Sequence, residues 1–192
     1  MNSATQAFEF LIDAAFDAAI LLFLFRFILQ LVEVDFYNPL TQFVVKLTKP
    51  ILKPLSFIPT VKRWNFAALL VMLILESLKI IINIEVEKGM MPYIPGILLW
   101  AFGDLLYYFV HLFFFAILAM AVLSWVRPTG GNALMEVLYK ITMPLMRPFR
   151  RVIPTIGGVD ITPIPALIAL KFFSILMIEP LVMTGINLAA AG

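Results

Sequence analysis

The sequence contains one polar, proline-containing segment twice, and each copy lies between two long apolar runs. An asparagine, a threonine and two prolines recur at a constant offset of 94 residues. They are Asn38, Thr48, Pro50 and Pro54 in the first copy and Asn132, Thr142, Pro144 and Pro148 in the second. The offset grows to 95 between Pro59 and Pro154, which indicates one inserted residue. This spacing predicts two tandem copies of one unit, residues 1–90 and 91–192, within a single domain.

The apolar runs exclude a water-soluble fold. Of the 192 residues, 62% are hydrophobic and only 14% are charged, whereas soluble domains carry roughly 25% charged residues. The runs at residues 11–34, 64–84, 97–126 and 163–188 each reach the roughly 20 residues that a helix needs to cross a bilayer. No run alternates with a period of two, so we predict an all-α membrane protein with four transmembrane helices. We expect the start of the third run, near Trp100 and Asp104, to lie in the membrane interface.

Lysine and arginine are concentrated in two of the connections. Residues 33–63 and 127–162 hold five each, whereas residues 85–96 hold only Lys88 and the two termini hold none. The positive-inside rule then predicts that both basic segments lie in the cytoplasm and both termini lie outside it. Because the two halves share one orientation, we expect parallel repeats around an axis along the membrane normal.

Each basic segment begins with the pattern of a short amphipathic helix. Asn38 and Asn132 are typical N-caps, and Pro39 suits the first helical position. Apolar residues then follow i, i+3, i+4, i+7 spacing, namely Leu40, Phe43, Val44 and Leu47, and again Leu134, Val137, Leu138 and Ile141. We predict that these helices lie in the inner interface and end at Pro50 and Pro144, followed by an irregular proline-rich loop. Gly157 and Gly158 would turn the chain into the last run.

These residues resemble the YggT family of small bacterial membrane proteins, which has relatives in chloroplasts. The resemblance rests on residues 36–40, 48–54, 123–126 and 142–154 and on Gly157, Gly158 and Asp160. It implies a four-span protein of the bacterial inner membrane that is not an enzyme. Family members are associated with osmotic or ion-stress tolerance, with division regions, and with nucleoid or cytochrome-complex organisation in plastids. The first copy departs from the second, because Ser56-Phe57 stands where Arg150-Arg151 stands.

Charged residues inside the apolar runs are candidates for function, because a charge within a membrane is costly. Glu76 and Lys79 lie one turn apart in the second run, and Lys171 lies in the fourth. The offset of 95 maps Glu76 onto Lys171, so two repeats around one axis would bring these opposite charges to the same depth. We expect either a buried structural pair that fixes the packing of the halves or an ion or proton site.

The first and third runs carry further candidates. Arg26 could extend to the inner surface, and His111, the only histidine, could relay protons or hydrogen-bond between helices. Glu9, Asp13 and Asp17 form an i, i+4, i+8 stripe that could be a cation vestibule or the wet face of a helix end. The chain has no cysteine, and His111 has no second ligand at metal spacing, so we expect no metal site. No nucleotide or dinucleotide motif is present, and we expect no cofactor.

The basic segments are the remaining candidate site. Their lipid- or partner-binding residues would be Lys46, Lys49, Lys53, Arg147, Arg150 and Arg151. Anionic lipid headgroups are near and sufficient as a partner, so direct nucleic-acid binding is not expected. The sequence thus favours a non-enzymatic organiser, assembly or stress-tolerance factor that acts through basic cytoplasmic surfaces and binds lipid or a protein. The alternative is a small ion channel or transporter subunit that uses the intramembrane charges and forms a homo-oligomer.

Overall fold

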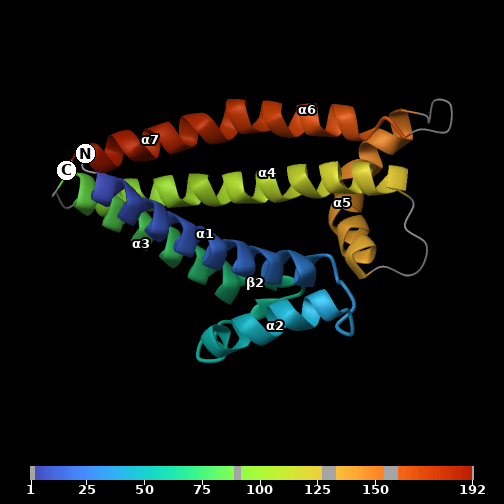
Figure 1. Ribbon diagram of the computed structural model, residues 1–192, viewed down its shortest axis with the longest axis horizontal. Coiled ribbons are helices and arrows are strands. Elements are labelled where there is room, and N and C mark those ends of the chain that lie inside the picture. Colours follow the sequence, from blue (N-terminus) through green and yellow to red (C-terminus); the bar gives the residue numbers. More distant parts are fainter. Residues whose placement is uncertain (1–2, 89–91, 127–132, 154–159, 192) are drawn as a thin grey trace.

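The computed structural model describes residues 3–88, 92–126, 133–153 and 160–191, and helices dominate it (Figure 1). The long helices are α1 (Ser3–Leu31), α3 (Phe66–Lys88) and α4 (Ile94–Val126). Helix α6 (Pro163–Phe173), the π-helical turn η1 (Ser174–Ile178) and α7 (Glu179–Ala190) follow one another without a break. Two shorter helices are α2 (Pro39–Leu52) and α5 (Ala133–Val152).

Three segments of the described chain are long and apolar enough to cross a membrane, namely Phe66–Glu87, Ile94–Leu123 and Pro163–Ala190. Segments of this length and hydropathy are typical of membrane spans. The chain is therefore an all-α, multi-pass membrane protein.

Helix α4 is the centre of the arrangement. It packs against α3 on one side and against the continuous rod of α6, η1 and α7 on the other, while α1 packs mainly against α3. Both termini lie at one end of the bundle, α5 lies at the opposite end, and α2 lies beside the second half of α1 (Figure 1). Helix α5 crosses that end and contacts α1, α2, α4 and α6.

The main core lies where α1 meets α3 and α4. Ile20, Leu24 and Phe27 are spaced three or four residues apart along α1 and are fully buried, together with Met72 of α3. This spacing places them on one face of the helix. Within a bilayer such a core is stabilised by close van der Waals packing, because lipid tails are as apolar as the side chains.

Helices α4 and α7 approach most closely where each presents a small residue. A Cβ atom added to Gly96 would lie 2.2 Å from the backbone nitrogen of Ala189, and one added to Gly185 would lie 2.5 Å from that of Trp100. Gly185 and Ala189 are four residues apart, which is the small-xxx-small spacing of close membrane helix pairs. Larger side chains at these positions would push the two backbones apart.

The last rod contains a feature that the apolar pattern does not predict. Residues Ser174–Ile178 form a π-helical turn immediately before α7, whose first turn contains Pro180. Proline lacks an N–H group, and its ring collides with the carbonyl group four residues earlier. A wider turn before the proline relieves this collision and keeps the rod continuous.

The prolines of the duplicated segment do not end their helices, contrary to the prediction. Helix α2 continues through Pro50 to Leu52, and α5 continues through Pro144 and Pro148 to Val152. The predicted irregular loop is therefore wrong for the second copy as far as residue 152, whereas Pro54 of the first copy does lie in turns after α2. Asn132, Pro154, Gly157 and Gly158 lie outside the described residues.

Tertiary packing explains why α5 passes its prolines. An internal proline costs a helix on the order of 3 kcal/mol, because it removes one hydrogen bond and strains the preceding turn. Beyond Pro144, Met146 is buried against α4 and α6 and Phe149 packs on the same cluster. These contacts offset the cost and keep the last two turns helical.

A threonine two residues before the proline behaves in the same way in both helices. The hydroxyl group of Thr48 donates to the carbonyl oxygen of Val44 at 2.7 Å, and that of Thr142 donates to Leu138 at 2.8 Å. Both threonines are buried, so these bonds satisfy hydroxyl groups that lie among apolar neighbours.

One small β-hairpin is a further departure from the all-helical prediction. Strand β1 (Thr60–Val61) pairs with β2 (Trp64–Asn65) in antiparallel register, with a two-residue turn between them. Lys62 has a φ angle of 56° at the first position of this turn. Strand β2 occupies the first two residues of the second apolar run, and the helical span begins only at Phe66, so the strand edges lie outside that span and do not have to be satisfied within lipid.

Candidate functional site

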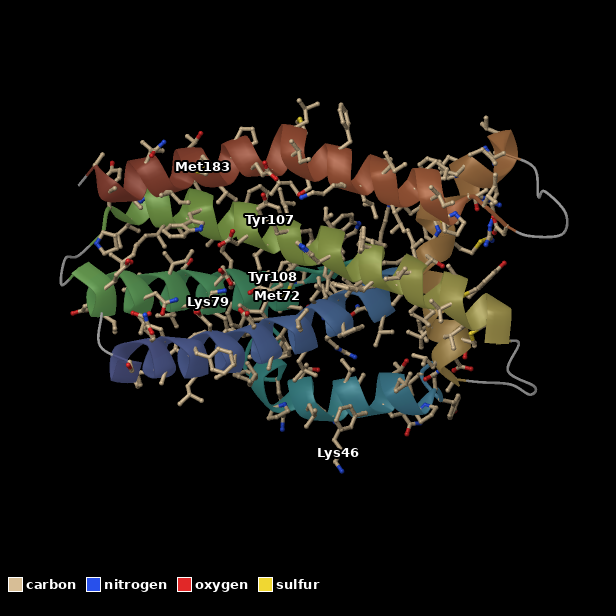
Figure 2. The ribbon with its side chains drawn as sticks, turned by 45° about the horizontal axis from the view of Figure 1, so that its top comes forward. Lys46, Met72, Lys79, Tyr107, Tyr108 and Met183 are labelled. Carbon is tan, nitrogen blue, oxygen red and sulfur yellow. The ribbon has the colours of Figure 1, made fainter. Side chains whose placement is uncertain are left out.

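The charged groups of the long helices meet around Lys79 of α3. Its ammonium group lies 2.9 Å from a carboxylate oxygen of Asp17 on α1 and 2.9 Å from one of Glu76. It also donates to the hydroxyl oxygen of Tyr108 on α4 at 2.9 Å, and that hydroxyl group donates to Asp17. Lys79 and Tyr108 point into the space between the helices (Figure 2). Residues from three helices thus share one ion-pair network.

Glu76 is the most deeply placed member of this network. Its side chain is 0% exposed, and Lys79 is not aligned as a hydrogen-bond donor to it despite the short ion-pair distance. Neither carboxylate oxygen of Glu76 accepts a hydrogen bond from any described residue. The carboxyl group that faces it across α3 and α4 belongs to Asp104, which is partly buried. Asp104 therefore lies within the bundle, against another acid.

Two residues of the acidic stripe of α1, Asp13 and Asp17, contact polar side chains of α3. The side-chain amide of Asn83 donates to Asp13 at 2.7 Å, one turn of α1 before Asp17 meets Lys79. Farther toward the N-terminus, one carboxylate oxygen of Glu9 is buried and accepts no hydrogen bond from the described residues. A polar seam between α1 and α3 therefore runs from the Lys79 network toward the end of the bundle that holds the termini.

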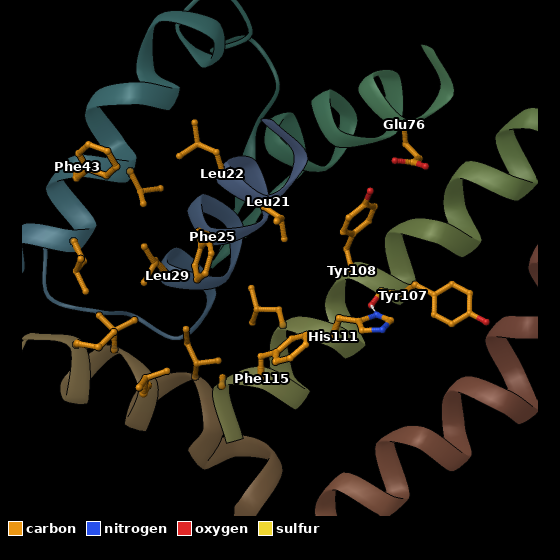
Figure 3. Close-up of a pocket in the computed structure, with 18 of the residues that line it drawn as sticks. Leu21, Leu22, Phe25, Leu29, Phe43, Glu76, Tyr107, Tyr108, His111 and Phe115 are labelled. Carbon is orange, nitrogen blue, oxygen red and sulfur yellow. Dashed lines mark hydrogen bonds between the residues drawn. The ribbon is translucent and has the colours of Figure 1, made fainter. Parts of the chain in front are cut away.

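A cavity of about 870 Å³ opens beside this network (Figure 3). Polar groups lie toward one side, where Glu76 and Tyr108 point into the space between α3 and α4. The remaining walls are apolar and come from α1, α2, α4 and α5, with Phe25, Phe43 and Phe115 among them. Apolar walls favour hydrocarbon over water, so this cavity does not resemble a hydrated ion path.

Arg26 and His111 do not join the network. Arg26 is half-buried on α1, and its Nε atom has no hydrogen-bond partner among the described residues. His111 is exposed on α4 and lines the same cavity, and its Nδ1 atom lies 2.8 Å from the carbonyl oxygen of Tyr107 in its own helix. The expected hydrogen bond from His111 to another helix is thus replaced by one within α4.

The expected pairing of Glu76 with Lys171 is wrong. Lys171 lies 3.8 Å from Glu179, and their side chains are 64% and 45% exposed. Helix α4 lies between α3 and the rod that carries Lys171, which keeps the two charges on opposite sides of it. Corresponding positions in the two predicted repeats are therefore not in contact here.

Asn38 connects the two short helices at the other end of the bundle. Its side-chain oxygen accepts from the backbone nitrogen of Leu40 at 3.0 Å and so caps α2. Its amide nitrogen donates to the carbonyl oxygen of Ala133 at 3.0 Å and to Glu136 at 3.1 Å, both in the first turn of α5. The hydrogen bond from Asn38, followed by that from Lys140, lowers the pKa of the Glu136 carboxyl group. One asparagine therefore caps one helix and anchors the next.

The six basic residues predicted to bind lipid or a partner are exposed, but they are not equivalent. Lys46 points away from the bundle (Figure 2), and no ion pair with a described residue involves Lys46, Lys49, Lys53, Arg147 or Arg151. Arg150 differs, because it binds Asp160 through Nε at 3.2 Å and through Nη2 at 3.0 Å. Arg150 therefore links α5 to the start of the last rod and is less free than the other five to meet a partner.

Asp160 holds this link from the other side. One of its oxygens accepts hydrogen bonds from the backbone nitrogen and the hydroxyl group of Thr162, and the other faces Arg150. Partial burial alone would raise the pKa of Asp160, but the bonds from Thr162 and Arg150 outweigh it and lower the pKa. Arg150 and Asp160, which are ten residues apart in the sequence, thus clamp the two ends of the segment between α5 and α6.

Two members of the Lys79 network are not apparent from the apolar pattern. Tyr108 is one of many aromatic residues in the third run, and Asp104 stands near its start, where an interfacial position is also plausible. Asp104 and Tyr108 are four residues apart, which places a carboxyl group and a hydroxyl group on one face of the helix. This spacing is the sequence signal that could have identified them.

Comparison with known proteins identifies the same family that the sequence motifs resemble. The model of the CCB3/YggT family matches residues 5–84 and 99–181, which together include most of the chain. An uncharacterized protein of Pseudomonas aeruginosa is 40% identical over 169 residues, which cover 86% of each chain. A Vibrio alginolyticus protein is 35% identical over 174 residues, which cover 90% of this chain and 94% of the relative.

The protein of Escherichia coli K12 named YggT is 35% identical over 186 residues, which cover 96% of this chain and 94% of the relative. No solved structure matches the chain significantly. Two matched segments of the family model and relatives of similar length lead to one conclusion: the chain belongs to the CCB3/YggT family of membrane proteins.

Proposed function

We propose that the chain crosses the bacterial inner membrane four times in two tandem halves, with α1 as the first span. Helix α1 has 29 residues, and its Asp13 and Asp17 are covered by partners on α3. Pairing removes much of the cost of placing such charges in lipid. The matching threonine bonds of α2 and α5 and the two segments matched by the family model support the tandem halves.

The orientation proposed for these spans has the α2 and α5 end in the cytoplasm and both termini outside. The excess of lysine and arginine near α2 and α5 supports it. In intact cells, a cysteine in place of Ala190 should react with an impermeant thiol reagent, and one in place of Lys62 should not. Labelling of the cysteine at position 62 would show that the protein has the opposite orientation.

In this arrangement α2 and α5 lie as amphipathic helices on the inner surface and form one basic surface, here defined as Lys46, Lys49, Lys53, Arg147 and Arg151. We propose that the protein is a non-enzymatic organiser or assembly factor that binds anionic lipid headgroups through this surface, in support of osmotic or ion-stress tolerance. The observation that carries the proposal is the contact of Asn38 with Ala133, which joins the two basic helices at one end of the bundle. Each free cation near an anionic leaflet adds about 1 kcal/mol of attraction.

A lipid-retention experiment tests this proposal. The purified protein would be mixed with phosphatidylglycerol or with phosphatidylcholine, and bound lipid would be counted by native mass spectrometry. Changing the five residues of the basic surface to glutamine should reduce phosphatidylglycerol binding severalfold. Added salt should also reduce phosphatidylglycerol binding by the wild-type protein, because salt screens exposed charges. Phosphatidylcholine binding should not change.

Lys171→Gln is the matched control, because it removes one cation from the opposite side of α4. It should retain wild-type binding of phosphatidylglycerol. Equal binding by the wild type and the five-residue variant would disprove the lipid surface. A variant that keeps its lipid but fails to complement a deletion strain at normal abundance would instead point to a protein partner.

A small channel or transporter subunit is the second candidate, and one observation favours it. Glu76, Lys79 and Asp104 line the large cavity, so charged groups are not sealed from it. The apolar walls of that cavity and the complete pairing of Lys79 weigh against conduction. A cation-flux assay with the reconstituted protein distinguishes the two candidates. Flux through the wild-type protein that is abolished by Glu76→Gln would favour the channel or transporter over the organiser.

A further inference from the structure

The buried carboxyl group of Glu76 lacks what a buried carboxylate normally requires. Glu76 is the eleventh residue of the 22-residue segment Phe66–Glu87, and its side chain is 0% exposed. Neither of its oxygens accepts a hydrogen bond from a described residue. An ionised carboxylate in an apolar interior is strongly unfavourable unless hydrogen bonds and opposite charge compensate it.

The charges around Glu76 do not balance. Three carboxyl groups, those of Asp17, Glu76 and Asp104, surround the one ammonium group of Lys79, and Tyr108 adds a neutral hydroxyl group. Lys79 and Tyr108 both direct their hydrogen bonds to Asp17. Lys79 lies 2.9 Å from both Asp17 and Glu76, so one ammonium group serves three carboxyl groups and leaves an excess of negative charge around Glu76 and Asp104.

Two facing carboxylates offer four acceptor oxygens and no donor. A proton on one of them supplies the missing donor, removes one negative charge and creates a strong hydrogen bond between the acids. We propose that Glu76 and Asp104 share one proton and form a proton-binding site inside the helical bundle. The proton is the ligand, and no change of covalent structure or redox state is involved.

The surroundings provide a way for this proton to exchange. On one side, the polar seam continues from Asp17 to Asp13 and Asn83 toward the end that holds the termini. On the other side, both acids border the mostly apolar cavity, and Tyr107 and His111 of α4 are the additional titratable groups in its wall. The site joins α3 to α4, so binding and release of the proton would alter the contact between the two halves. This inference is independent of the basic surface.

Infrared spectroscopy of the protein in phosphatidylcholine vesicles tests the proposal. At neutral pH the wild type should show the carbonyl band of a protonated carboxyl group, identified by its shift in heavy water. Glu76→Gln and Asp104→Asn should each lose this band, because the acid that remains lies near Lys79 and ionises. Glu179→Gln, which changes an acid on the far side of α4, should keep it.

The wild-type spectrum keeps the test decisive even if a variant fails to fold. Raising the pH should remove the band in a single-proton transition, and absence of the band at every pH would overturn the proposal. Survival of the band in both single variants would also overturn it, because the proton would then reside elsewhere. A band that appears only after sodium is removed would assign the site to a metal cation and would refute the proton.

Discussion

Lys79 of α3 and Asp17 of α1 form an ion pair across 2.9 Å that joins the first two long helices. Lys79 is only 13% exposed, and its third contact, with Tyr108, extends the same connection to α4. Three helices therefore each place one acid near the same ammonium group, and of these acids only Glu76 is fully buried.

Lys79→Met should destabilise the protein strongly, because it leaves Asp17, Glu76 and Asp104 without a cation. Removal of one partner from a buried pair costs on the order of 3–5 kcal/mol. The double variant with Asp17→Asn should lose less than the sum of the single variants, with a coupling of about 0.5–3 kcal/mol. Thermal unfolding in detergent measures both. Lys171→Met, which breaks an exposed pair, should cost about 0–1 kcal/mol, and additivity of the first two changes would contradict the pairing.

Asn38→Ala should destabilise the junction of α2 and α5, because it removes the cap of α2 and the bonds to α5. Loss of an asparagine cap alone typically costs about 1 kcal/mol. Asn38→Asp retains the capping oxygen but directs a negative charge at Glu136, so it should also destabilise, and Glu136→Gln should partly rescue it. Melting temperatures of the four proteins provide the comparison. If Asn38→Asp melted at the same temperature as the wild type, the hydrogen bonds from Asn38 to α5 would contribute nothing to stability.

Gly185→Ala should separate α4 from α7, because its new Cβ atom would meet the backbone of Trp100 at 2.5 Å. Insertion of a methyl group into tight packing costs about 1–3 kcal/mol. Gly103→Ala is the control, because its new Cβ atom would meet a side-chain methyl group and not the backbone. That methyl group belongs to Val182, would lie 2.6 Å away and is removed by Val182→Ala. We expect unfolding temperatures to fall for both single variants and to recover only for the pair Gly103→Ala with Val182→Ala. Wild-type stability of Gly185→Ala would show that the helices do not pack this closely.

The bridge between Arg150 and Asp160 should depend on pH. The pKa of Asp160 is lowered in the folded protein, so its contribution is present above the unfolded value of about 3.9 and is lost as the pH falls through the folded value. Because both side chains are partly exposed, we expect at most about 1 kcal/mol. The difference in melting temperature between wild type and Asp160→Asn should be largest near neutral pH and vanish in acid. A difference that persists in acid would rule out this origin.

Much of the fold could be predicted from local chemistry. The length and apolarity of Phe66–Glu87, Ile94–Leu123 and Pro163–Ala190 indicate membrane spans without reference to neighbours. Asn38 followed by Pro39 indicates where α2 begins, because the cap and the proline satisfy that helix end with atoms close in the sequence. The end of the same helix was not predictable, because the cost of Pro50 depends on what the final turns contact.

Contacts between distant charges were decided by tertiary packing. The repeat offset suggested that Glu76 meets Lys171, but the glycine contacts of Gly96 and Gly185 hold α7 against α4, so α4 separates the two charges. Glu76 lies instead beside Lys79 and Asp104.

The sequence by itself determined the class of the protein, its spans and the start of α2, because apolar length and helix capping act over a few residues. Only the tertiary structure decided the partners of the buried acids and the role of Arg150. An ion pair forms where two helices bring side chains within a few ångströms, and the relative rotation of packed helices is set by contacts such as Gly185 with Trp100. No local pattern contains that rotation, so the neighbours of Glu76 follow only from the assembled bundle.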